Sequence, residues 1–228
     1  MASKNFPGVI GMLDGCHIPI KQPKVHGASY FNRKSFYSIV LQGKNSYQTL
    51  LFHIYSYFKF SGVCRKDLSF TDVFVGFPGR VHDSRILSNS PLFDNGPALC
   101  GNNHVFGDSA YPNINWIMTP FCRTQQMTLQ MTRYNGVHSS IRIKIEQAFG
   151  MLKGRFRRLK YIDQDSVESM CFTICTACVL HNICIWQNDF DDIINDNNVP
   201  AAYLHGNLFN RNLQLIGNQK RNQIMNQL

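Results

Sequence analysis

The chain has 228 residues, of which 44% are hydrophobic and eight are cysteines, and a formal net charge of +9 at pH 7. One sizeable core and one domain are predicted, while the lack of a signal-peptide segment and of about eighteen consecutive uncharged apolar residues argues against a secreted or membrane-spanning protein. The charge favours a polyanionic partner, most commonly nucleic acid, and the scattered cysteines fit reduced thiols in the cytosol or nucleus better than a disulfide framework.

The first part of the chain is predicted to form strands. Residues 8–20 are an apolar run typical of a strand that is buried on both faces. Residues 35–42 and 68–76 are rich in aromatic and β-branched side chains, as strands tend to be. Because turn chemistry separates the three segments, an antiparallel meander is expected.

A helix and a fourth strand are predicted next. Asp83 or Ser84 is a candidate N-cap for a short helix within residues 81–93. Residues 104–109 read as a strand, and the helical crossover before them predicts that this strand runs parallel to a neighbour.

The second half of the chain is predicted to be helical. Residues 113–138 have little periodicity and are expected to form a loop with one helical turn. Helices are predicted over 139–159 and 166–187, and the second is apolar nearly all round, so we expect it to be buried. Residues 187–228 are rich in Asn, Asp and Gln and are expected to be largely disordered.

Two aspartates share one local pattern. Asp14 follows an apolar run and precedes a glycine, and Asp108 ends a second short apolar run. A buried carboxylate is costly unless something compensates its charge. If the two strands are neighbours, the two carboxylates would repel each other, and a bound divalent cation such as Mg²⁺ resolves this. The alternative for either residue alone is the start of an ordinary turn.

A third acid lies on the predicted helix over 139–159. Glu146 falls at the edge of the apolar stripe, with Arg142, Lys153 and Arg157 on the same side. This pattern fits an acid that reaches a metal beside cations that contact DNA phosphates. The alternative is a solvated helix face on which Arg142 and Glu146 pair at i, i+4.

Two further residues have open interpretations. Asp83 is either a fourth acid of the site or a helix cap. His17 follows Asp14 by three residues, which places the two side chains on opposite faces of a strand. A hydrogen-bonded structural histidine is therefore the favoured reading of His17 over a metal ligand.

With these residues in view, the chain resembles the DDE domain of PIF/Harbinger-type transposases and the nucleases derived from them. The matching motifs occur in the family's order and span about residues 8–185. They are residues 11–20 (GMLDGCHIPI), 30–34 (YFNRK), 72–85 (DVFVGFPGRVHDSR), 107–112 (GDSAYP), 134–135 (YN), Arg142 with 145–156 (IEQAFGMLKGRF), and 180–182 (LHN).

The resemblance implies an α/β, RNase H-like fold, with a mixed five-stranded sheet flanked by helices. It also implies that Asp14, Asp108 and Glu146 are catalytic, metal-binding acids, with Mg²⁺ or Mn²⁺ as the cofactor. DNA is then the expected substrate, and the nucleus, with the cytoplasm as a further setting, the expected location. Two metal ions in such a site activate water or a 3′-hydroxyl and stabilise the leaving oxygen.

Two features depart from the family pattern. Family proteins usually carry a helical region ahead of the first acid, whereas this chain begins close to that acid, so help from a separate Myb-like DNA-binding protein is expected. Residues 43–62 form an aromatic segment where the family joins two strands closely. We therefore expect an insertion at 43–62 within a nuclease domain over 8–186, followed by the tail over 187–228.

Three functions remain open from the sequence. The first is a metal-dependent endonuclease of transposase descent, which the intact set of three acids favours. The second is a domesticated, non-catalytic module that binds DNA or protein. The third is a truncated, inactive transposase product.

Overall fold

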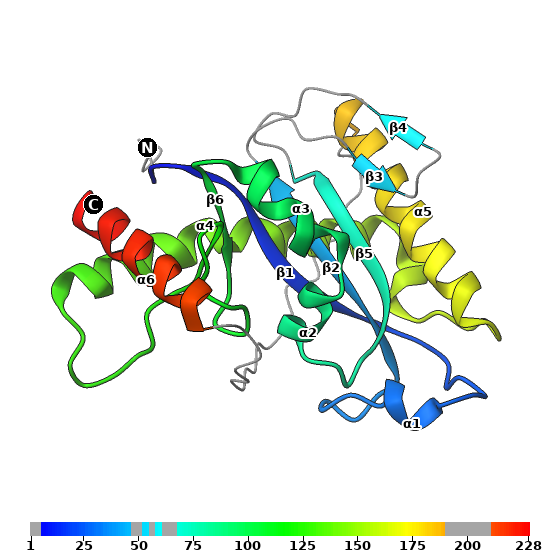
Figure 1. The fold of residues 1–228 in the computed structure, drawn as a ribbon. Helices are drawn as coiled ribbons and strands as arrows, with labels where there is room; N and C mark the ends of the chain where they lie inside the picture. Colours follow the sequence, from blue (N-terminus) through cyan, green and yellow to red (C-terminus); the bar gives the residue numbers. More distant parts are fainter. Residues whose placement is uncertain (1–5, 47–51, 55–57, 61–67, 190–210) are drawn as a thin grey trace.

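The structure is a computed structural model that describes residues 6–46, 52–54, 58–60, 68–189 and 211–228. A five-stranded mixed sheet with the order β5-β2-β1-β6-β7 lies at its centre (Figure 1). β2 pairs antiparallel with β1 and β5, whereas β6 runs parallel to β1 and β7 parallel to β6. The strands are β1 (Val9–Pro19), β2 (Ser38–Ser46), β5 (Phe70–Pro78), β6 (His104–Gly107) and β7 (Ile117–Met118).

Helices lie on both faces of this sheet (Figure 1). The long helix α4 packs on β1 and β2, α5 packs on β5, and α6 packs on β7 and α4. The short helices α2 and α3 lie on the opposite face of the sheet (Figure 1). The helices are α1 (Gly27–Tyr30), α2 (Asp83–Ser88), α3 (Pro91–Cys100), α4 (Leu129–Arg155), α5 (Val167–Trp186) and α6 (Arg211–Asn226), and η1 (Arg157–Lys160) is a 3-10 helix.

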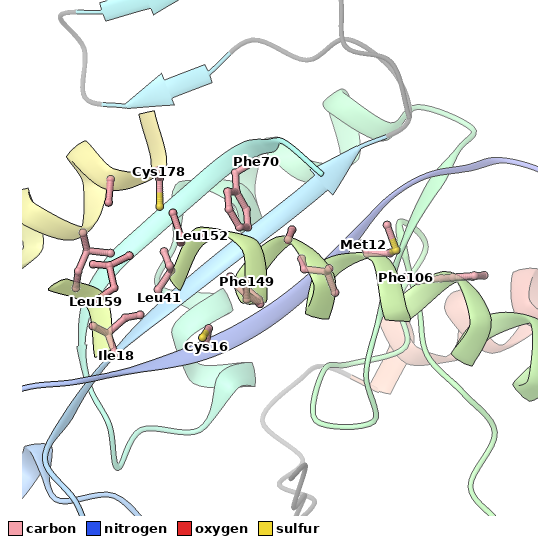
Figure 2. Close-up of a cluster of buried hydrophobic side chains, with 14 of the residues drawn as sticks. Met12, Cys16, Ile18, Leu41, Phe70, Phe106, Phe149, Leu152, Leu159 and Cys178 are labelled. Carbon is pink, nitrogen blue, oxygen red and sulfur yellow. The ribbon is translucent and has the colours of Figure 1, made fainter. Parts of the chain in front are cut away.

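The sheet separates two hydrophobic clusters. Side chains alternate along a strand, so Met12 and Leu13 of β1 point to opposite faces and are both buried. Met12 belongs to the larger cluster between the sheet and helices α4 and α5, where Phe149 and Leu152 of α4 pack (Figure 2). Leu13 packs in the smaller cluster with Leu87 of α2. The prediction that residues 8–20 form a strand buried on both faces is confirmed.

The predicted loop over 113–138 is wrong in its second half. α4 begins at Leu129, and the side chain of Thr128 caps it by accepting a hydrogen bond from Met131 N. Tyr134 and Val137 supply the buried face of these first turns. Few apolar residues lie in this stretch, so its period was too weak to recognise in the sequence.

The prediction that the helix over 166–187 is wholly buried is also wrong. One face of α5 packs in the core, but Phe172, Leu180, Ile183 and Trp186 are exposed. By length and composition alone α5 could cross a membrane. In this structure its His181 is fully buried and its Asn182 side chain hydrogen-bonds the backbone of Phe70 in β5, as a core helix of a globular domain does.

The predicted start of the insertion needs correction. Residues 43–46, placed in an insertion, continue β2 and pair with β1 and β5. β3 (Phe52–Ile54) and β4 (Phe58–Phe60) form a separate antiparallel pair, while 47–51, 55–57 and 61–67 lie outside the described residues.

The tail contains ordered structure that was not expected. Residues 211–226 form α6, which buries Gly217 and Ile224 against the domain, so the expectation of disorder is wrong for this part. The tail's high polar content hid the small apolar face that α6 uses. Residues 190–210 lie outside the described part of the chain.

Candidate active site

The register of the two central strands brings the two predicted aspartates together. β1 and β6 are parallel neighbours, and Leu13 pairs with Gly107. Asp14 is the next residue of β1 and Asp108 directly follows the end of β6, so the two residues are neighbours. Asp14 is 6% exposed and Asp108 is fully buried. The predicted proximity of these two acids is therefore present in the structure.

Each carboxylate is oriented by a backbone amide. Asp14 Oδ1 accepts a hydrogen bond of 2.8 Å from Gly15 N, and Asp108 Oδ1 accepts one of 2.8 Å from Ala110 N. Burial, followed by the charge of Asp108, raises the pKa of Asp14 to about 8. Ionising both of these neighbouring buried carboxyls is therefore unfavourable unless a cation offsets their charge.

Asp83 joins this pair. It is the first residue of α2, whose N-cap is His82, and no side chain caps the helix. A β carbon added to Gly15 would lie only 2.7 Å from Asp83 Oδ1, so Asp83 lies against β1 at Gly15, the residue after Asp14. Burial and the charge of Asp108 raise the pKa of Asp83 to about 6. The helix-cap interpretation is therefore wrong, and Asp83 lies within the acidic group.

Glu146 is connected to these acids through an arginine. Arg142 Nη2 on α4 donates a hydrogen bond of 2.9 Å to Glu146 Oε1, and Arg142 Nε lies 3.7 Å from Asp14 Oδ2. The i, i+4 pair that the sequence offered as an alternative is thus present, and the same guanidinium bridges to β1. Glu146 has 53% of its side chain exposed, so it lies at the rim of the acidic group.

The three cations predicted to contact DNA phosphates have different environments. Arg142 is mostly buried between Asp14 and Glu146. Lys153 Nζ donates a hydrogen bond of 2.9 Å to the backbone oxygen of His17. Arg157 is exposed in η1. Among the three, Arg157 has the exposure that a phosphate contact requires in this conformation.

His17 is hydrogen-bonded, as the sequence predicted. Its Nδ1 lies 3.0 Å from Ser38 Oγ on the neighbouring strand β2. Burial, together with the charges of Lys34 and Lys153, lowers the pKa of His17 to about 4. The neutral ring therefore links β1 to the start of β2.

Sequence reasoning missed two buried polar residues that line the acidic group. Gln42 Nε2 donates a hydrogen bond of 3.0 Å to the hydroxyl of Tyr111. Burial and the charges of Asp83, Asp14 and Asp108 raise the pKa of Tyr111 well above its usual range, so this phenol stays protonated beside the carboxylates. The available sequence signal for Gln42 was a polar residue at the end of the apolar strand predicted over residues 35–42.

The donor set can be tested against a divalent cation. No three His, Cys, Asp or Glu side chains are arranged to hold one metal ion within residues 6–46, 52–54, 58–60, 68–189 and 211–228. The chemistry of the donors nevertheless fits Mg²⁺ or Mn²⁺, because both prefer hard carboxylate oxygens and the buried Asp14, Asp83 and Asp108 supply them.

Comparison with known proteins identifies the class of this domain. A family model described as DDE superfamily endonuclease matches residues 13–182, which is most of the chain and includes all four acids. The chain therefore belongs to the DDE superfamily of endonucleases, and the predicted RNase H-like α/β fold is confirmed. Endonucleases of this superfamily generally use divalent metal ions.

The relatives place the chain more closely. It is 32% identical over 182 residues to "Putative nuclease HARBI1" of Homo sapiens and of Bos taurus, matches that cover 78% of this chain and 46% of each relative. It is 26% identical over 202 residues to "Protein ALP1-like" of Arabidopsis thaliana, covering 81% of this chain and 45% of that protein. The resemblance to Harbinger transposase-derived nucleases is thus confirmed. The chain spans about half the length of these relatives, and no solved structure matches it significantly.

Proposed function

We propose that this chain hydrolyses DNA phosphodiester bonds with divalent metal ions held by Asp14, Asp108 and Glu146, and with Asp83 as a fourth acid. The observation that carries the proposal is the meeting of Asp14 and Asp108 at adjacent parallel strands, with Asp83 beside them. So many buried carboxylates destabilise an empty site and favour a bound cation.

The protein's own groups would orient and shield the reacting phosphate. When bound, the metal ions would activate the attacking water molecule and stabilise the leaving oxygen. The amide of Gly15 binds one oxygen of Asp14, and the amide of Ala110 binds one oxygen of Asp108. These hydrogen bonds fix the orientation of each carboxylate before a metal binds. Tyr111 is buried near Asp83, Asp14 and Asp108, whose charges add to the effect of burial in raising its pKa.

Arg142 has two roles in the proposed mechanism, first as a partner of the acids and then as a phosphate contact. In the present conformation it neutralises part of the charge of Asp14 and holds Glu146 at the rim. Entry of a divalent cation would release the guanidinium from Asp14, because the cation offsets the same negative charge. Arg142 would then face the phosphate of the DNA, which is how it could still serve as the predicted phosphate contact.

The proposal also covers the substrate, the partner protein and the cellular location. The net charge of +9 and the exposed Arg157 favour DNA as the polyanionic substrate. A nuclear location and assistance from a separate Myb-like DNA-binding protein are part of this proposal, since DNA in the nucleus is the substrate it requires.

A plasmid assay tests the proposal. Supercoiled plasmid is incubated with the purified full chain and Mg²⁺ or Mn²⁺, beside the variants Asp108→Asn and Glu146→Gln. The matched controls Asp163→Asn and Glu168→Gln change exposed acids away from the site. We expect the wild type and both controls to cut the plasmid only when metal is present. Each site variant should cut more slowly by a factor larger than the roughly 10–100-fold that is typical of losing an outer-sphere partner of a metal.

The other outcomes of this assay are equally informative. Equal cutting by the wild type and both site variants would identify a contaminating nuclease and contradict the proposal. DNA binding without cutting in either metal would instead support a non-catalytic binding module.

A further inference from the structure

A cavity of about 690 Å³ is lined by two cations and two aromatic rings. Its volume is within the range of small-molecule sites, about 300–1,000 Å³. Helix α1 and the turn after it form most of its wall, and Arg80, from the connection between β5 and α2, completes it. The lining residues are Ala28, Phe31, Asn32, Arg33, Tyr37 and Arg80.

The turn over residues 31–37 is held in one shape by a buried asparagine. Asn32 Oδ1 accepts hydrogen bonds from Lys34 N at 2.9 Å and from Phe36 N at 3.3 Å, and Asn32 Nδ2 donates one of 2.8 Å to Ser38 Oγ. Ser38 Oγ also contacts His17 on β1. The cavity wall is therefore preorganised and tied to the strand that carries Asp14.

The two arginines are exposed and available to an anion. Neither Arg33 nor Arg80 forms an ion pair within the described ranges of the chain. The charge of Arg33 reaches the acidic group, because it is one of the groups that lower the pKa of Asp83, which burial raises. Arg80 is three residues before Asp83. The connection between β5 and α2 thus carries Arg80 of the cavity and ends at Asp83 of the acidic group.

The aromatic rings offer a stacking surface beside these cations. Phe31 is 43% exposed, and its ring centroid lies 5.2 Å from that of Tyr37 in an edge-to-face arrangement. An exposed phenylalanine held by a partner ring offers a fixed apolar face to a flat ligand. Arginines next to aromatic rings are the combination that proteins use to hold unpaired nucleotides.

We propose that this cavity binds one unpaired nucleotide of the DNA substrate, with its base on Phe31 and its phosphates on Arg33 and Arg80. The proposal rests on the proposed function, since it names the form of DNA that the acidic group would act on. A nucleotide in paired duplex cannot use the cavity, because its base is covered by its neighbours. The cavity thus favours DNA with unpaired residues beside the bond that is cut.

Binding measured without metal separates this proposal from cleavage. The full chain is titrated in EDTA with a blunt duplex and with the same duplex carrying a short single-stranded extension that contains 2-aminopurine. We expect tighter binding of the extended duplex and quenching of the 2-aminopurine on binding. Phe31→Ala should abolish the quenching and weaken binding of the extended duplex roughly tenfold. Failure of the nuclease proposal would leave these results unchanged.

Salt dependence distinguishes the arginines from the ring. Arg33→Ala and Arg80→Ala should each reduce the slope of log K against log salt by about 0.7, the value for one phosphate contact on a single strand, whereas Phe31→Ala should leave the slope unchanged. Phe172→Ala and Arg123→Ala remove an exposed ring and an exposed cation elsewhere and should bind as the wild type does. Circular dichroism confirms the fold of each variant.

Three results would overturn the proposal. Equal affinity of the wild type for the blunt and extended duplexes is the first. The second is a Phe31→Ala variant that binds the extended duplex and quenches 2-aminopurine as the wild type does. The third is an equal loss for both duplexes in all three cavity variants, which would assign the cavity to the backbone of paired DNA.

Discussion

Arg142 Nε on helix α4 lies 3.7 Å from Asp14 Oδ2 on strand β1. The same guanidinium donates a hydrogen bond to Glu146, so one cation joins the most buried part of the site to its rim. Buried carboxylates need a compensating charge, and Arg142 provides it in this conformation. A divalent metal ion would take over the same role.

Replacing Arg142 should destabilise the metal-free protein and increase the stabilisation that a bound metal ion provides. Arg142→Met removes a cation that lowers the pKa of Asp14 and leaves the buried Asp14 carboxyl without this partner, which costs about 1–3 kcal/mol. We expect a fall of a few degrees in Tm without metal and a larger rise on adding Mn²⁺ than in the wild type, both measured by scanning calorimetry. Arg133→Met, at an exposed position of the same helix, is the control. A smaller metal-induced rise would show that Arg142 and metal do not compete.

A single methyl group should displace the fourth acid. Gly15→Ala places a β carbon 2.7 Å from Asp83 Oδ1, so the Asp83 carboxylate must move. If Asp83 helps to hold metal, cleavage should fall by about 10–100-fold while the circular dichroism spectrum stays the same. Gly136→Ala has open space around its added carbon and should cleave DNA as the wild type does. Full activity of Gly15→Ala would remove Asp83 from the mechanism.

The central strands were predictable because their composition reports burial directly. The apolar run that became β1 is covered on both faces, and the glycine after Asp14 marks the place where Asp83 approaches. Parallel pairing of β6 followed from the helical crossover before it. These two features were enough to place Asp14 beside Asp108.

The rest of the site depends on contacts between elements that spacing does not report. Helical spacing relates Arg142 to Glu146, but its second partner, Asp14, lies on a strand far away in sequence. An acid at the first turn of a helix fits capping and a site equally well, so the interpretation of Asp83 needed its tertiary position. Tyr111 follows a turn whose path only the packed structure determines.

Acid should destabilise the fold through two buried histidines. Burial lowers the pKa of His104 to about 3 and that of His138 to about 4, both below 6.5. Between pH 6.5 and about 4 these two histidines bind protons in the unfolded chain but not in the folded chain, so their contribution to the free energy of unfolding falls as pH falls, by on the order of 1.4 kcal/mol per pKa unit for each histidine. The raised pKa values of Asp14 and Asp83 act in the opposite direction, because their contribution to stability is present below pH 3.8 and is lost as the pH rises to about 8 for Asp14 and about 6 for Asp83.

A matched variant isolates the histidine contribution. His104→Phe keeps a ring beside Phe6 and Phe106 and removes one titrating group, while the carboxylates are unchanged. Urea unfolding between pH 4 and 7 should show a smaller loss of stability on acidification than in the wild type. His26→Asn changes an exposed histidine with a left-handed backbone and should follow the wild type. If His104→Phe loses as much stability between pH 7 and pH 4 as the wild type does, His104 is not a source of the acid sensitivity.

Docking of the C-terminal helix depends on a glycine. A β carbon on Gly217 of α6 would lie 2.6 Å from Ile114 Cα, and backbone cannot move aside as a side chain can. α6 is otherwise held by Lys220 Nζ, which donates hydrogen bonds to three backbone oxygens, and by Arg221, which lies 4.0 Å from the centroid of the Phe121 ring. Gly217→Val should therefore detach α6, and limited proteolysis should cut within residues 211–228 at least about tenfold faster than in the wild type, as expected when a docked segment opens. Asn222→Ala changes an exposed residue of the same helix and should be cut at the wild-type rate; equal rates for Gly217→Val would show that α6 does not need this close approach.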